Sequence, residues 1–123
     1  MTAKALAKRV AVLASERKAI DIQVLELAKL TSFTDYFVVC SGSSDRQVKA
    51  IADSVEVSLK EEGQRPIGAE GAAGSKWVLV DYGSVVLHVF YEAEREYYAL
   101  EKLWFDAPRL KIKGVTDEKR EAS

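Results

Sequence analysis

The feature that most constrains the fold is a strand-like segment that leads directly into an amphipathic helix. Residues 36–40 are apolar at every position, as in a central strand covered on both faces. Small polar residues follow at 41–44, and apolar side chains then recur every three or four positions over residues 45–62, which predicts a helix. A strand followed by a helix and further strands is typical of an α/β fold with parallel neighbours.

The ends of this helix are also marked in the sequence. Ser44 and Gln47 have the spacing of a capping box at its start, and Gly63 is a typical residue just after a last helical turn. Similar periodicities predict a helix at 2–17, strands at 20–24, 77–81 and 85–90, an edge strand near 65–69, and a last helix at 92–106.

These elements predict an α/β (α+β-like) protein with a mixed parallel and antiparallel sheet of about five strands flanked by helices. The 123 residues suit a single domain, which we place at residues 1–110. Residues 111–123 are charged and short of large apolar side chains, so we expect them to form a flexible tail.

Composition excludes several classes of protein. The chain has 18 basic and 19 acidic residues, so we expect no strong direct binding to nucleic acid. No apolar stretch approaches the ~20 residues of a membrane span, and no secretory signal is visible, so a cytoplasmic location is expected. Cys40, the single cysteine, lies within the apolar run and is predicted to be a buried hydrophobic residue.

The sequence offers little for catalysis, and we expect a protein that is not an enzyme. One His and one Cys cannot form a zinc site of the usual kind, so no metal, cofactor or catalytic residue is predicted. The turn at residues 41–44, between the predicted strand and the predicted helix, could hold a phosphate on its backbone N–H groups, as in nucleotidyltransferases. Such enzymes need an Asp-x-Asp pair on the next strand, which here ends in Asp81 alone. A nucleotide-binding protein of this kind is the alternative.

Aromatic residues point to a different kind of site. If Tyr82 and Gly83 form a two-residue hairpin turn, alternation fixes which side chains share a face. One face is apolar core, and the other carries Trp77, Leu79, Asp81, Ser84, Val86 and His88. The stretch 92–106 adds Tyr98 and Trp104 among five acids and two basic residues. Rings surrounded by charge are typical of a protein interface with a basic partner, although they could also be buried within the monomer.

Three motifs resemble those of the ribosomal silencing factor (RsfS, or Iojap) family and occur in the family's order. They are DYFVVCSGSSDRQV at 35–48, WVLVDYGSVVLHVF at 77–90, and REYYALEKLW at 95–104 followed by DAP at 106–108. The resemblance covers about residues 3–110. It implies a sheet topology like that of nucleotidyltransferases, without their catalytic metal ligands.

The resemblance also implies a function. Members of the family bind the fourteenth protein of the large ribosomal subunit, block joining with the small subunit and repress translation when nutrients are limiting. They also tend to form homodimers. The partner-binding residues implied here are Trp77, Asp81, Tyr82, Val86, His88, Tyr98 and Trp104. Ser84 is a departure, because family members often carry an acid there. A second interpretation is that the aromatic face is the seam of a homodimer.

Overall fold

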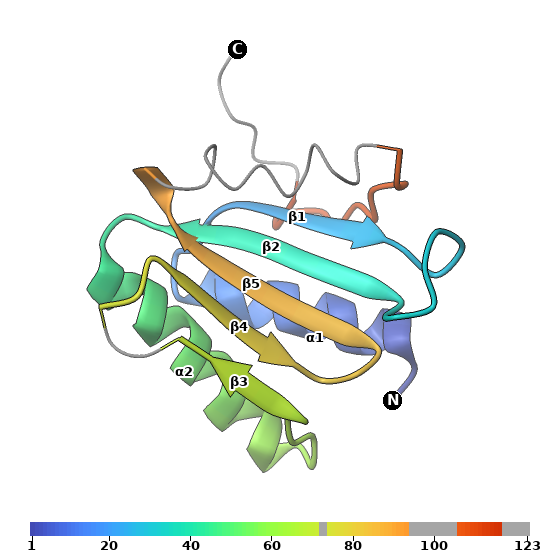
Figure 1. The fold of residues 1–123 in the computed structure, drawn as a ribbon, viewed down its shortest axis with the longest axis horizontal. Helices are drawn as coiled ribbons and strands as arrows, with labels where there is room; N and C mark the ends of the chain where they lie inside the picture. Colours follow the sequence, from blue (N-terminus) through green and yellow to red (C-terminus); the bar gives the residue numbers. More distant parts are fainter. Residues whose placement is uncertain (72–73, 94–105, 117–123) are drawn as a thin grey trace.

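The computed structural model describes residues 1–71, 74–93 and 106–116, and within them the chain forms two helices and five strands (Figure 1). The elements are α1 (Ala3–Glu16), β1 (Ile20–Glu26), β2 (Tyr36–Gly42), α2 (Asp45–Glu61), β3 (Gly68–Glu70), β4 (Trp77–Asp81) and β5 (Val85–Tyr91). The last predicted helix, at 92–106, is described only at its two ends. Residues 92 and 93 are helical, and residues 94–105 lie outside the described residues.

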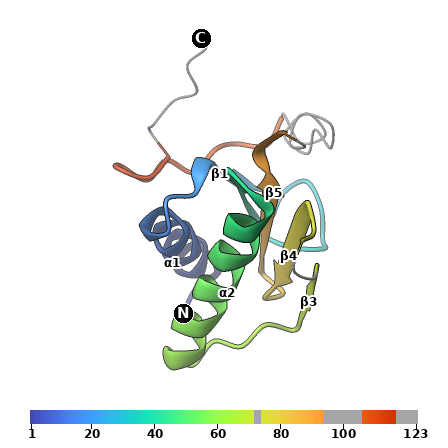
Figure 2. The ribbon, with the colours of Figure 1, turned by 90° about the vertical axis from the view of Figure 1, so that its left-hand side faces the viewer.

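The five strands form one mixed sheet in the order β1-β2-β5-β4-β3. The pair β2 and β5 is parallel, and every other pair is antiparallel, so the predicted mixed α/β sheet is confirmed. The parallel neighbour of β2 is β5 rather than the first strand after α2, because β3 and β4 lie beyond β5. Figure 2 shows that α1 and α2 pack on the same face of the sheet. The predicted likeness to nucleotidyltransferases in particular stays a prediction.

The main core lies between the two helices and this face of the sheet. The apolar stripe predicted for α2 is fully buried there, opposite the strand residues Val38, Cys40, Val80, Leu87 and Val89. Cys40 has no exposed surface, which confirms that it is a buried residue. Removing this apolar surface from water at roughly 25 cal/mol per Å² is the main force that holds the helices on the sheet.

The start of α2 confirms the predicted cap and corrects one detail of it. The Ser44 Oγ accepts a hydrogen bond from the Gln47 backbone N–H at 3.1 Å. Gln47 Oε1 accepts from the backbone N–H of Ser43 at 2.6 Å, one residue earlier than a capping box predicts. The other end of α2 is at Glu61 with Glu62 as its C-cap, and Gly63 follows with a φ of +86°, a conformation that glycine adopts without strain.

Replacing Ser44 by Ala is expected to lower the free energy of unfolding by about 1 kcal/mol, because a helix N–H loses its acceptor. Urea unfolding followed by circular dichroism measures the change. Ser58→Ala is the matched control: Ser58 lies inside α2, where Ala is the better helix former. Equal losses from the two substitutions would contradict the role of Ser44 as the cap.

The hairpin between β4 and β5 turns one residue later than predicted. Tyr82 donates its backbone N–H to Val85 at 2.8 Å, so Gly83 and Ser84 occupy the turn. Gly83 has a φ of +88° and its N–H donates to Asp81 Oδ1 at 2.7 Å. Trp77 therefore pairs with Phe90, whereas a turn at Tyr82 and Gly83 would have paired it with His88. The shift is two residues along the partner strand, so each side chain keeps its predicted face.

The outer edge of β1 is covered at residues 24–26 by the chain's own later residues. Glu26 donates its backbone N–H to Pro108, and Leu110 donates to Val24, around a bridge between Leu25 and Arg109. Beyond this bridge, Ile112 and Val115 pack against the main core, although both fall in the segment predicted as a tail. The division at residue 110 stays a prediction.

The opposite edge of the sheet is β3, a strand of three exposed residues. It overlaps the edge strand predicted near 65–69 and lies slightly later in the chain. Pro66, which has no N–H to donate, precedes it.

Candidate binding face

The face of the sheet opposite α1 and α2 carries a second apolar cluster. Its buried members are Leu25, Leu27, Val39, Phe90 and Ala107, and Phe37 and Trp77 pack against them half-buried. His88 lies among these side chains with 4% of its surface exposed. We call the four rings Phe37, Trp77, His88 and Phe90 the aromatic cluster.

The rings of the aromatic cluster contact one another closely. The imidazole of His88 meets Phe37 edge-on, with ring centroids 4.4 Å apart, and is stacked with Phe90 at 6.3 Å and an interplanar angle of 8°. Trp77 lies 5.1 Å from Phe90 and 5.9 Å from His88, measured between centroids. Such ring pairs stabilise beyond the area that they bury and hold each ring in a fixed orientation.

One hydrogen bond within the cluster joins Trp77 to His88. The indole Nε1–H of Trp77 donates to His88 Nδ1 at 3.1 Å, diagonally across the β4–β5 pair. Burial lowers the pKa of His88 from 6.5 to about 4, so the imidazole is neutral at physiological pH. His88 therefore belongs to the interior of this face, with little surface to offer a partner.

Three further predicted site residues lie at the surface of the same face. Trp77 and Asp81 on β4 and Val86 on β5 are half-buried, and Asp81 pairs with Val86 across the strands. The carboxylate of Asp81 also accepts the hydrogen bond from Gly83 that closes the hairpin. The structure thus brings Trp77, Asp81, Val86 and His88 together on one face.

Tyr82 does not join these residues. It continues the alternation of β4, so its side chain packs half-buried against the main core on the helix side. Burial raises the pKa of its hydroxyl to about 12. Tyr98 and Trp104 lie outside the described residues, and the predicted roles of all three in partner binding stay predictions.

The sequence analysis missed Phe37 and Phe90 as parts of this face. Residues 36–40 are apolar throughout, so nothing in that run distinguished Phe37 from its neighbours. Once Val38 and Cys40 are assigned to the helix side, alternation places Phe37 and Val39 on the other. Phe90 lies two residues after His88 and four after Val86 on β5, so alternation places all three side chains on the same face. The sequence alone was enough to predict this.

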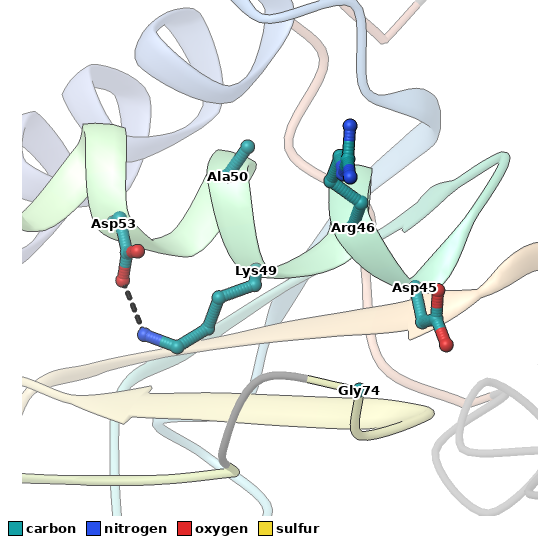
Figure 3. A pocket seen from close by; sticks show the side chains of 6 residues that line it. All are labelled: Asp45, Arg46, Lys49, Ala50, Asp53 and Gly74. Atoms are coloured by element: carbon teal, nitrogen blue, oxygen red, sulfur yellow. Dashed lines mark hydrogen bonds and ion pairs between the residues drawn. The ribbon is translucent and has the colours of Figure 1, made fainter.

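A hollow of about 440 Å³ lies at the start of α2, close to the turn predicted to suit a phosphate (Figure 3). Its charged lining is two acids and two bases: Asp45, Arg46, Lys49 and Asp53. Lys49 donates to Asp53 at 2.5 Å, and Lys76 reaches Asp45 at 3.6 Å. The balanced charge gives little attraction for an anion, so this hollow does not favour the nucleotide-binding alternative.

Within residues 1–71, 74–93 and 106–116, no three His, Cys, Asp or Glu side chains come close enough to hold a metal ion. None of the helices in these ranges is long and apolar enough to cross a bilayer.

Two helices on one face of a mixed sheet and an aromatic cluster on the other define a small α/β domain with a candidate binding face. The particular family follows from sequence comparison. The chain belongs to the ribosomal silencing factor (RsfS) family, because the family model described as "Ribosomal silencing factor during starvation" matches residues 1–123.

Individual relatives agree with this assignment. Ribosomal silencing factor RsfS of Bacillus subtilis strain 168 is 44% identical over 108 residues, which cover 88% of this chain and 92% of that protein. The mouse protein "Mitochondrial assembly of ribosomal large subunit protein 1" is 36% identical over 92 residues, which cover 72% of this chain and 40% of its own. A crystal structure of a Chromobacterium violaceum protein is similar, with a TM-score of 0.82, 40% identity and coverage of 95% and 98%.

Proposed function

We propose that this protein silences ribosomes by binding the large ribosomal subunit through its fourteenth protein, where it blocks joining with the small subunit. The outcome is repression of translation under nutrient limitation. Membership of the ribosomal silencing factor family supports the silencing role. The name of the mouse relative, which refers to assembly of the large subunit, supports that subunit as the partner.

The observation that carries the proposal is the half-buried group of Trp77, Asp81 and Val86 on one face of the sheet. Trp77 rests on buried Phe90, so its ring gives a partner contact area at a low cost in side-chain entropy. Asp81, held at the hairpin, places a carboxylate beside this apolar surface and favours a basic partner.

The proposed action is binding without a catalysed reaction, and it requires no metal or cofactor. Tyr82, Tyr98 and Trp104 are proposed to extend the contact area. We also propose that the protein forms a homodimer and acts in the cytoplasm.

Trp77→Ala is expected to weaken binding to large subunits by about 2 kcal/mol or more, because it removes the central aromatic contact. Sedimentation through sucrose gradients gives the measurement: the wild-type protein should comigrate with large subunits and reduce the amount of joined ribosomes. Asp81→Asn tests the charge separately, since the amide oxygen can still accept the hydrogen bond from Gly83.

Val57→Ala is the control, because Val57 is 58% exposed on α2, away from the proposed face. Wild-type protein that stays at the top of the gradient would count against the proposed function. If Trp77→Ala abolishes dimerisation and leaves ribosome binding unchanged, the face is a dimer seam.

A further inference from the structure

His88 is the only histidine of the chain, and it lies among the aromatic side chains of Phe37, Trp77 and Phe90. Its ring contacts are those of an aromatic side chain, with Phe37 edge-on and Phe90 stacked. What an imidazole adds is its two nitrogen atoms. Their hydrogen bonds therefore decide what this residue does.

The bond to Trp77 fixes which nitrogen carries the proton. An indole Nε1–H can only donate, so His88 Nδ1 must be the unprotonated acceptor of the bond at 3.1 Å. In the neutral ring the proton then lies on Nε2. Nε2 is buried and finds no hydrogen-bond partner in the described part of the chain.

The buried Nε2–H lowers the stability of the fold, whereas Nδ1 orients Trp77. A buried donor without a partner is destabilising, and a phenylalanine would avoid that cost. The benefit is the Nδ1 acceptor, which holds the indole plane of half-buried Trp77 against Phe90. With 4% of its surface exposed, His88 has almost no area of its own for a partner.

We propose that His88 is a positioning residue: it acts on partner binding through Trp77, by accepting the indole N–H and holding that ring in its docking orientation. The inference rests on the proposed function and deepens it. It differs from the direct binding of a partner that the family resemblance implied for His88.

The test compares two substitutions that differ in the acceptor. His88→Phe keeps an aromatic ring and removes Nδ1, whereas His88→Asn places an amide oxygen near the position of Nδ1. Binding to purified large subunits should weaken about three- to tenfold for His88→Phe, the value of one hydrogen bond. His88→Asn should retain most of the wild-type affinity.

Nuclear magnetic resonance provides a readout that general destabilisation does not move. The chain has two tryptophans, and Trp104→Phe assigns the Trp77 indole N–H signal. In the folded protein, the chemical shift of that proton should lie at the downfield position of a hydrogen-bonded indole in the wild type and in His88→Asn, and move upfield in His88→Phe. Should His88→Phe fail to fold, Trp77→Phe removes the donor from the other end of the same bond.

A double-mutant cycle decides between indirect and direct action. If His88 acts through Trp77, His88→Phe should cost almost nothing in affinity once Trp77→Phe is present. Additive losses, or equal losses for His88→Asn and His88→Phe, would overturn the proposal. Wild-type protein that does not bind large subunits would instead refute the proposed function, and the indole signals would still report whether the Trp77–His88 bond exists.

Discussion

Replacing Phe90 by Ala is expected to lower the free energy of unfolding by about 3–5 kcal/mol, the range for removing a large aromatic side chain from a core. Phe90 has no exposed surface and lies between Trp77 and the other members of the second cluster. The neighbours belong to three different strands and cannot all move into the space left behind. Urea unfolding at neutral pH measures the loss.

The chain contains a matched control for this substitution. Phe33 lies in the loop between β1 and β2 and is 88% exposed, so Phe33→Ala removes the same atoms without leaving a cavity. Its effect should stay within about 0.5 kcal/mol, as for most surface substitutions. Similar losses at the two positions would mean that the second cluster contributes little to stability.

Lowering the pH from 7 to 4 is expected to remove about 3 kcal/mol of stability through His88, of which about 2 kcal/mol is lost by pH 5. Burial lowers the pKa of His88 from 6.5 in the unfolded chain to about 4 in the folded protein. Between these values the unfolded chain binds a proton that the folded protein does not. The contribution is fully present above about pH 6.5 and disappears as the pH falls through this window.

The single histidine makes this experiment clean. Unfolding free energies of the wild type and of His88→Asn, measured by urea titration from pH 7 to pH 4, share the contributions of all carboxyl groups. Their difference therefore isolates His88. Parallel profiles for the two proteins would show that the imidazole is not kept neutral by burial.

Much of the fold was predictable because each element carries its own periodicity. The stripe of α2 and the alternation of β4 identify which side chains are buried without any tertiary information. The position of the hairpin turn was not fixed in this way. A glycine suits the first or the second place of a two-residue turn, so Gly83 allowed both registers. The structure selects the one in which the Tyr82 backbone N–H bonds to Val85 before the turn, and the Tyr82 side chain packs on the helix side.

The candidate site was predictable in part, because the alternation of side chains along a strand also fixes which residues share a face. The faces of Trp77, Asp81, Val86 and His88 follow from alternation, which a two-residue shift preserves. The bond from Trp77 to His88 depends on the register of β4 and β5, and the ring that covers His88 edge-on, Phe37, is brought alongside by a parallel strand from a distant part of the sequence. No local pattern contains that information.

The backbone hydrogen bonds that join β1 to Pro108, which accepts, and to Leu110, which donates, have a further consequence for how this protein behaves at high concentration. An unpaired strand border is a template on which other chains can add and form aggregates. Here the molecule covers residues 24–26 of one border with its own chain, and among the described strands the other border is only the three residues of β3. Both features limit the joining of copies of this protein, edge to edge, into an endless sheet.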